Sequence, residues 1–169
     1  NYKNGKEHGL KELFYKNGQV EERVNYKYGK KHGLSEVFDD NGQLQYRKNF
    51  KNGKQKGLWE SYHNNGQLKT KGNYKNGQRD GLVETFFKNG RLRSRGNYKN
   101  GRRDGLVESF YKNGQLRIRQ NYKTRKRDGL WEYFDEEGNL IKSENWNKGR
   151  LWGTDYWKNG KLVDSEIPF

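Results

Sequence analysis

Six glutamates recur at one position of a repeated pattern and are the first residues in this chain that could carry out chemistry. Paired carboxylates act as general acid and base when their environments separate their pKa values. Successive glutamates are 24 residues apart, and two strands per copy would separate them by about 10 Å. An inverting glycosidase could use that spacing, but an active site is unique and this array is uniform. We therefore predict a structural role, no catalytic residues and no enzymatic activity for Glu12, Glu36, Glu60, Glu84, Glu108 and Glu132.

The three histidines are the next candidates for chemistry. His8 and His32 share one position of the pattern, whereas His63 occupies another. Zinc ligands lie about 2 Å from their ion, so residues one copy apart are too distant to share it. The chain has no Cys, which excludes disulfides and thiolate metal sites. We predict no metal site and no cofactor.

The same pattern defines the elements that must position these residues. Each copy reads N-Y-K-N-G-x-x-x-G-L-x-E-x-F-x-x-N-G-Q-L, followed by four variable residues. Gly is abundant while Ala and Met are absent, which favours hairpins over helices. We expect residues 1–169 to form a single repeat domain, with a shorter, degenerate copy that caps it from Asn145. Complete copies begin at Asn1, Asn25, Asn49, Asn73, Asn97 and Asn121.

Asn-Gly pairs predict where the chain reverses. A two-residue type I′ turn requires positive φ at both central residues, which Asn and Gly tolerate best. We assign such turns to residues 17–18, 41–42, 65–66, 89–90, 113–114 and 159–160. The second connection, residues 99–105 in one copy, is expected to be longer than two residues. There a bulge or a positive φ is predicted at Gly9, Gly33, Gly57, Gly81, Gly105 and Gly129.

These turns fix a register that can be tested against charge. A turn at residues 17–18 places Glu12 opposite Arg23. The same arithmetic pairs Glu36 with Arg47, Glu60 with Lys71, Glu84 with Arg95, Glu108 with Arg119 and Glu132 with Ser143. Strand alternation then places the leucine and glutamate rows on one face and the Val20 and Tyr26 rows on the other. We predict an all-β fold, an elongated single-layer antiparallel β-meander of 24-residue hairpin repeats, roughly 65 Å long.

The unit G-L-x-E-x-F-x-x-N-G-Q-L-x-x-x-x-x-Y-K-N-G-K resembles the bacterial variant of the MORN repeat over essentially the whole chain. The resemblance implies successive hairpins in an elongated single-layer sheet. It also implies similarity to bacterial proteins of an antitoxin family, which would bind a toxin protein, and to MORN proteins linked to membranes or scaffolding. Arg125 departs from the pattern where the turn glycine is expected, and the copy from Asn145 lacks two residues.

The net charge of +15 points to an anionic partner. A basic edge beside the second connection is formed by Lys27, Lys51, Lys75, Lys99, Arg102, Arg103 and Lys123. Anionic membrane binding is one interpretation, and protection of open sheet edges is the alternative. Nucleic acid is disfavoured because ladder packing already explains the aromatic positions. The chain contains no apolar run long enough to span a membrane and no signal segment. Because it begins at Asn1 in phase with the repeat, we expect a trimmed or processed chain. Its localisation stays open.

Positions that vary between copies predict where a partner binds. They follow the repeated leucine and lie on the opposite face, as an apolar patch in a very polar chain. The patch consists of Trp59, Val83, Phe87, Val107, Tyr111 and Trp131. Trp146, Trp152 and Trp157, joined by Trp131, are interpreted either as a cap or as interface anchors. Our hypothesis is that the chain is a non-enzymatic scaffold that binds a protein, and the resemblance implies a toxin as that partner. Binding to an anionic membrane is the alternative. The oligomeric state stays open.

Overall fold

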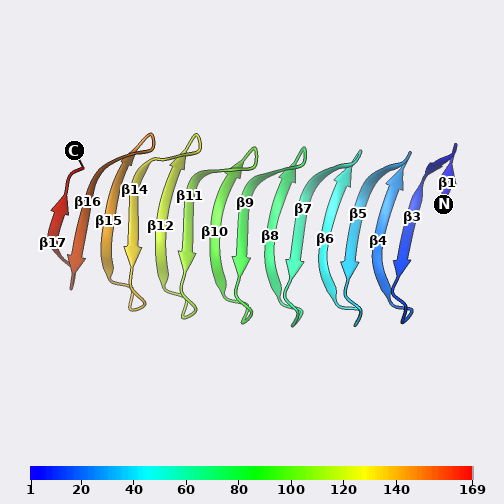
Figure 1. Ribbon diagram of the computed structural model, residues 1–169, viewed down its shortest axis with the longest axis horizontal. Coiled ribbons are helices and arrows are strands. Elements are labelled where there is room, and N and C mark those ends of the chain that lie inside the picture. The colour runs from blue at the N-terminus through cyan, green and yellow to red at the C-terminus, as the bar shows by residue number, and fades with distance from the viewer. Residues whose placement is uncertain (169) are drawn as a thin grey trace. The chain divides into compact units, whose positions relative to one another are not determined.

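The computed structural model describes residues 1–168. This part of the chain forms β-strands and contains no helix (Figure 1). Packing divides the chain into two compact units. Unit 1 comprises residues 1–81 and 88–90, and unit 2 comprises residues 82–87 and the chain from Arg91. The strand β9 (Gln78–Phe86) begins in unit 1 and ends in unit 2.

Unit 1 is a meander of antiparallel strands. A short pair, β1 (Tyr2–Lys3) and β2 (Lys6–Glu7), comes first. The strands that follow pair in chain order. They are β3 (Gly9–Phe14), β4 (Val20–Lys27), β5 (Lys30–Phe38), β6 (Leu44–Lys51), β7 (Lys54–Tyr62) and β8 (Leu68–Lys75).

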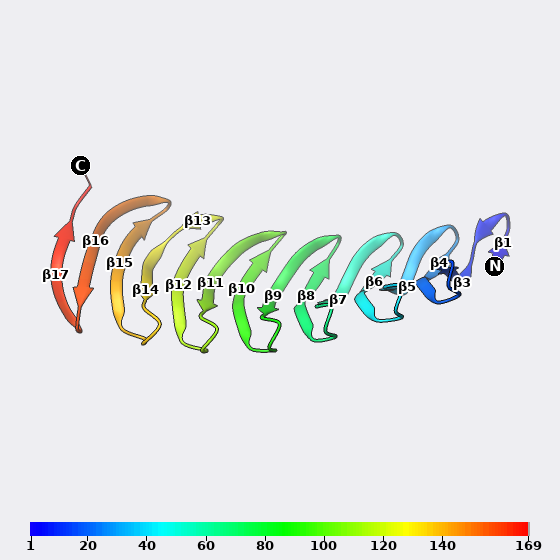
Figure 2. The same cartoon turned by 60° about the horizontal axis from the view of Figure 1, so that its bottom comes forward.

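Unit 2 repeats this arrangement. Its strands pair antiparallel in chain order, and β12 pairs with both β13 and β14. They are β10 (Leu92–Lys99), β11 (Arg102–Phe110), β12 (Leu116–Lys123), β13 (Lys126–Arg127), β14 (Gly129–Phe134), β15 (Leu140–Asn147), β16 (Arg150–Lys158) and β17 (Lys161–Glu166). The predicted antiparallel meander of 24-residue hairpin repeats is confirmed. Figure 2 shows that the longer strands are bowed along their length.

The connections between β4 and β5, β6 and β7, and β10 and β11 are two-residue turns, which corrects the prediction of a longer loop. Asn52 and Gly53 have φ of 50° and 80°, and Asn100 and Gly101 have φ of 50° and 78°. Lys51 pairs with Lys54, and Lys99 pairs with Arg102, directly across these turns. Positive φ at both central residues is the type I′ geometry. The turn type predicted for one end of the repeat therefore occurs at the other end.

The Asn-Gly pairs that were assigned type I′ turns form a different loop. At residues 113–114, only Gly114 has positive φ, 98°. Its N–H donates to the carbonyl of Tyr111 at 3.0 Å, and the N–H of Tyr111 donates to the carbonyl of Gln115 at 2.9 Å. These bonds define a three-residue loop with a glycine bulge. The predicted type I′ turn is wrong here and holds at Asn159 and Gly160, whose φ values are 51° and 73°.

The predicted register survives because the bulged loop shifts the pairing only next to the turn. Glu12 pairs with Arg23, Glu108 with Arg119 and Glu132 with Ser143. Glu36 also pairs with Arg47, and Glu60 with Lys71, as predicted. The pairing of Glu84 with Arg95 stays a prediction.

The repeated glycine after the two-residue turn lies in a bulge, as predicted. Phe50 pairs with Gln55 while Lys48 pairs with Trp59, so β7 carries two extra residues there. Gly57 within this bulge has a φ of 83°, a conformation that a side chain would strain. Positive φ also occurs at the five equivalent glycines.

Hydrogen bonds between successive repeats use backbone groups that the turns expose. The turn N–H of Gly53 donates to the carbonyl of Lys31, and that of Gly149 to the carbonyl of Arg127, both at 2.8 Å. At the bulged loops, Asn113 Nδ2 donates to the carbonyl of Glu136 at 2.7 Å. The donor and acceptor in each of these bonds are 22 or 23 residues apart. The repeated Asn and Gly residues therefore tie each repeat to its neighbour.

Candidate functional site

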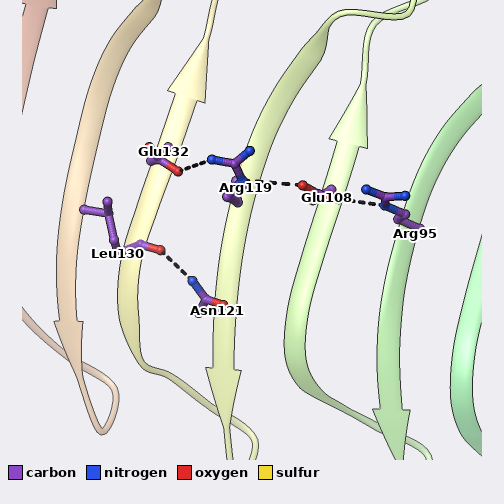
Figure 3. A network of polar contacts seen from close by, with 6 residues as sticks. All are labelled: Arg95, Glu108, Arg119, Asn121, Leu130 and Glu132. Carbon is purple, nitrogen blue, oxygen red and sulfur yellow. Dashed lines mark hydrogen bonds and ion pairs between the residues drawn. The ribbon is translucent and has the colours of Figure 1, made fainter.

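The glutamate row forms charged ladders rather than a catalytic array. In unit 2, Arg95 Nε lies 2.6 Å from Glu108 Oε2, and Arg119 Nε lies 3.4 Å from Glu108 Oε1. Arg119 Nη1 also reaches Glu132 Oε2 at 3.0 Å (Figure 3). Glu108 is only 5% exposed and is bonded from both sides. A carboxylate held in this way stabilises a charged pair and is poorly placed to move a proton.

Unit 1 contains the same Glu–Arg ladder, but its arginines differ in which glutamate they bond most closely. Arg23 Nε donates to Glu12 Oε1 at 2.7 Å, as the register predicted. Arg47 pairs with Glu36 on one neighbouring strand and with Glu60 on the other, and its Nε donates to Glu60 Oε2 at 2.5 Å. This bond crosses to the next hairpin, and it raises the pKa of Arg47 above its usual range. Since the arginines are nearly half exposed, each pair contributes little free energy, about 1 kcal/mol or less, and its main effect is to favour one register.

Two of the six residues in the predicted partner patch are buried by the chain itself. Val83 is 5% exposed and Trp131 is 2% exposed. Phe87, Val107 and Tyr111 are half-buried and keep accessible surface. The available surface of this patch is therefore smaller than its composition indicated.

Trp59 is also half-buried, and its environment differs from that of Trp131 at the same repeat position. The Tyr74 ring meets Trp59 edge-on at 5.8 Å, and the Arg79 guanidinium lies 5.6 Å from the indole centre. Trp131 Nε1 donates to the carbonyl of Asn121 at 2.9 Å. Trp59 Nε1 is buried and has no acceptor among residues 1–168. The indole N–H of Trp59 thus lacks the hydrogen bond that the indole N–H of Trp131 makes.

The C-terminal tryptophans separate into three environments. Trp131 packs at 5.8 Å from Trp146, and the Arg127 guanidinium lies 4.5 Å from both rings. Trp157 Nε1 donates to Ser143 Oγ at 3.2 Å, on the opposite face. Trp152 is 61% exposed. The predicted cluster therefore contains Trp131 and Trp146, and whether it serves as a cap or as an interface stays open.

A buried carboxylate that the sequence did not indicate lies beside this cluster. Glu144 is 9% exposed and accepts bonds from Lys142 Nζ at 2.7 Å, Trp146 Nε1 at 3.0 Å and Tyr133 OH at 3.0 Å. Burial opposes ionisation, yet these three donors outweigh it and lower the pKa of Glu144. Burial and the bond to Glu144 raise the pKa of Tyr133 to about 12. The three donors fix Glu144 as a structural anion rather than a general base.

The predicted basic edge contains cations that face each other. Lys27 pairs with Lys30, Lys51 with Lys54, Lys99 with Arg102 and Lys123 with Lys126, each directly across a two-residue turn. Like charges in this position destabilise a sheet. Lys75 ends β8 at the equivalent position. These repeated unfavourable pairs are the feature of the edge that folding alone does not explain.

A shallow hollow in unit 2 lies at this edge. It measures about 410 Å³ and is lined by Lys99, Asn100, Arg103, Asp104, Thr124 and Arg125. Arg103 Nη1 donates to Tyr122 OH at 3.1 Å, and hydrogen bonds to Tyr98 and Tyr122 raise the pKa of Arg103. Asp104 Oδ1 accepts a bond from the N–H of Thr124 at 3.1 Å. The hollow combines a fixed arginine with two further cations and one carboxylate.

The repeated leucines are more exposed than the sequence suggested. Each is between 36% and 45% exposed, on the face that carries the glutamate ladders. They are Leu10, Leu34, Leu58, Leu82, Leu106 and Leu130. The repeat pattern places this row on one face, and within residues 1–168 no second layer of strands or helices covers it.

Within residues 1–168, no three His, Asp or Glu side chains gather closely enough to hold a metal ion. The same residues include no helix long and apolar enough to cross a membrane.

The comparisons with known proteins agree with the repeat geometry. The family model described as MORN repeat variant matches six segments, residues 7–28, 31–52, 55–76, 79–100, 103–124 and 127–148. Each segment begins in the strand after one two-residue turn and ends in the next such turn. A search of curated proteins finds no match.

Proposed function

This chain belongs to the MORN repeat variant family, whose repeats are generally non-catalytic scaffolds for binding, and from that premise we propose that it binds a protein partner along its variable face. In unit 2 the surface concerned is formed by Phe87, Val107 and Tyr111, while Val83 and Trp131 support it from within. Trp59 is the corresponding half-buried position in unit 1. The resemblance to antitoxin-like proteins makes a toxin protein the partner that we propose first.

The contrast between the two faces supports this proposal. On one face, the repeated Glu and Arg residues bond each other and are committed to folding. On the other, the residue after the repeated leucine changes from Trp59 to Val107 without a change in pairing register. Half-buried aromatic and aliphatic side chains at variable positions make effective interface anchors, because little ordering entropy is lost on binding.

Neighbouring residues on β11 provide a matched test. Val107 lies on the variable face, and Leu106, which is 38% exposed, lies on the opposite face. We expect Val107→Gln to abolish stoichiometric capture of the partner from native lysate, and Leu106→Gln to retain it, with both variants folded by circular dichroism. Loss in Leu106→Gln alone would move the interface to the leucine row and contradict the proposal. The recovery of no stoichiometric protein by the unmodified chain would also count against it.

A second candidate function is peripheral binding to anionic phospholipid membranes through the basic edge. The observation in its favour is the set of directly opposed cations, such as Lys99 with Arg102, which a negative surface would stabilise. Vesicles containing phosphatidylserine should float with the protein at low salt and release it at high salt.

A variant with Lys99→Gln and Arg102→Gln should bind these vesicles more weakly, since each cation near the surface contributes about 1 kcal/mol. Lys112→Gln, which removes an exposed charge from the other end of the hairpin, is the control. Equal loss in both variants would indicate a net-charge effect, and no binding at low salt would remove this candidate.

A further inference from the structure

The two-residue turn at Lys148 and Gly149 leads into a bulge that is shorter than those after the earlier two-residue turns. Between β10 and β11, Tyr98 pairs with Arg103 and Gly96 with Val107, which leaves two extra residues on β11. Between β15 and β16, Trp146 pairs with Leu151 and Asn145 with Gly153. The extra residue on β16 is therefore Trp152 alone. A single-residue bulge leaves its side chain outside the ladder, and Trp152 is 61% exposed.

The repeated asparagine beside this bulge leaves its side-chain amide unbonded within residues 1–168. In the preceding repeat, Asn121 Nδ2 donates to the carbonyl of Leu130 at 3.2 Å, as Figure 3 shows. Asn25 and Asn49 donate to Leu34 and Leu58 in the same way. The exposed amide of Asn145 makes no such bond within residues 1–168. Its donor and acceptor are available to a ligand.

The exposed indole of Trp152 and the unbonded amide of Asn145 meet at one hollow. It measures about 580 Å³ and is lined by Asp128, Gly129, Asn145, Trp146, Asn147, Trp152 and Gly153. Asp128 Oδ1 accepts a bond from the N–H of Lys148 at 3.1 Å, which fixes the carboxylate and leaves Oδ2 available. No lysine or arginine is among the lining residues. The hollow thus combines aromatic surface, one carboxylate and two amides without a cation.

We propose that this hollow binds a neutral sugar, with one ring against the Trp152 indole and its hydroxyls bonded by Asp128, Asn145 and Asn147. A sugar ring has one face formed mainly by C–H groups, which suits the apolar face of an indole. Amides and a carboxylate can donate to and accept from adjacent hydroxyls and so fix the orientation. Phosphate and carboxylate ligands are disfavoured because they would meet Asp128 without a compensating cation. The volume suits about two sugar rings.

The test uses the full chain with three disaccharide probes, cellobiose, maltose and diacetylchitobiose, and with the acyclic polyol mannitol. Saturation-transfer NMR and tryptophan fluorescence should detect at least one disaccharide with a Kd in the millimolar range, as expected for an open site. Trp152→Ala should weaken binding about tenfold or more, while Trp152→Phe should retain most of it. Asn145→Ala should weaken binding by a smaller factor.

The control is Trp157→Phe, since Trp157 bonds Ser143 and does not line the hollow. This variant should bind as tightly as the unmodified chain. Because Trp152 is exposed, we expect its variants to stay folded, which circular dichroism checks. The proposal is overturned if no disaccharide binds up to about 10 mM, if Trp152→Ala binds undiminished, or if mannitol binds as well as the disaccharides.

Discussion

The Asn-Gly pair at residues 100–101 and the pair at residues 113–114 have the same sequence and different structures. At the first, both residues have positive φ and the turn joins Lys99 directly to Arg102. At the second, only Gly114 has positive φ, and Asn113 acts through its side chain. Its Oδ1 accepts from the N–H of Gln115 at 2.9 Å while its Nδ2 donates to the carbonyl of Glu136. The comparison shows that asparagine is repeated for its backbone at one end of the hairpin and for its amide at the other.

The largest effect should come from the amide at the bulged loop. Asn113→Ala removes both side-chain hydrogen bonds, and we expect the free energy of unfolding to fall by about 2 kcal/mol. Urea denaturation followed by circular dichroism measures it. Lys112→Ala, at the adjacent exposed residue, should leave stability nearly unchanged. Equal effects of the two substitutions would show that Asn113 has no special role.

The turn at residues 124–125 offers a gain in stability. Thr124 and Arg125 occupy the positions of Asn100 and Gly101 and have φ of 47° and 75°. Side chains with a Cβ are strained in this region. We expect the double substitution Thr124→Asn and Arg125→Gly to raise the free energy of unfolding by about 1 kcal/mol. Arg125→Lys keeps both the charge and the strain and should change nothing, so a gain there would refute the backbone explanation.

Glycine should distinguish the two asparagines directly. Asn100→Ala places alanine at positive φ and should cost about 1 kcal/mol, whereas Asn100→Gly should cost only a few tenths. At residue 113 glycine should be no better than alanine, because neither restores the amide. If glycine rescued position 113 as well, the proposed difference between the two pairs would be lost. The same denaturation measurements compare all four variants.

The smallest effect concerns the bulged loop that lacks the repeated asparagine and is held by the carboxylate of Asp135 instead. Glu137 stands at the asparagine position, and Asp135 Oδ1 accepts from the N–H of Asn139 at 2.7 Å. Hydrogen bonds from the Asn139 side chain and from nearby backbone lower the pKa of Asp135 below its usual range. Because the folded pKa is lowered, this stabilisation is present above the unfolded pKa and is lost as pH falls through the folded value. In thermal unfolding, Asp135→Asn should therefore be less stable than the unmodified chain at neutral pH and equally stable in strong acid. The loss of stability in Asn113→Ala should persist at both pH values. A loss of stability in Asp135→Asn that does not depend on pH would contradict this explanation.

Sequence reasoning recovered what depends on local spacing. Glu12 and Arg23 were paired by counting from a turn, and Gly57 was placed in a bulge because only a glycine fits there without strain. Both follow from constraints within one hairpin. The family of the repeat was recognised for the same reason, since its motif is local.

Features that depend on neighbouring repeats could not be recovered in this way. The two Asn-Gly pairs have equal turn propensity, and only the bond from Asn113 to Glu136 reveals which one uses its amide. Arg47 lies opposite both Glu36 and Glu60 by register, and spacing within one hairpin does not show that its Nε donates to Glu60. Glu144 acquires its donors from three different positions, and no spacing pattern marks it. Each outcome depends on distances that exist only after the strands are paired.

The bonds that link positions 22 or 23 residues apart also bear on how such a chain can change in length. Gly53 and Gly149 each complete a bond with the repeat before them, and Gly29 and Gly77 do the same. Duplication or excision of one 24-residue segment within a unit would rejoin equivalent partners and require no new kind of contact. Unequal recombination can therefore lengthen or shorten such a scaffold by whole repeats, and each product can still fold.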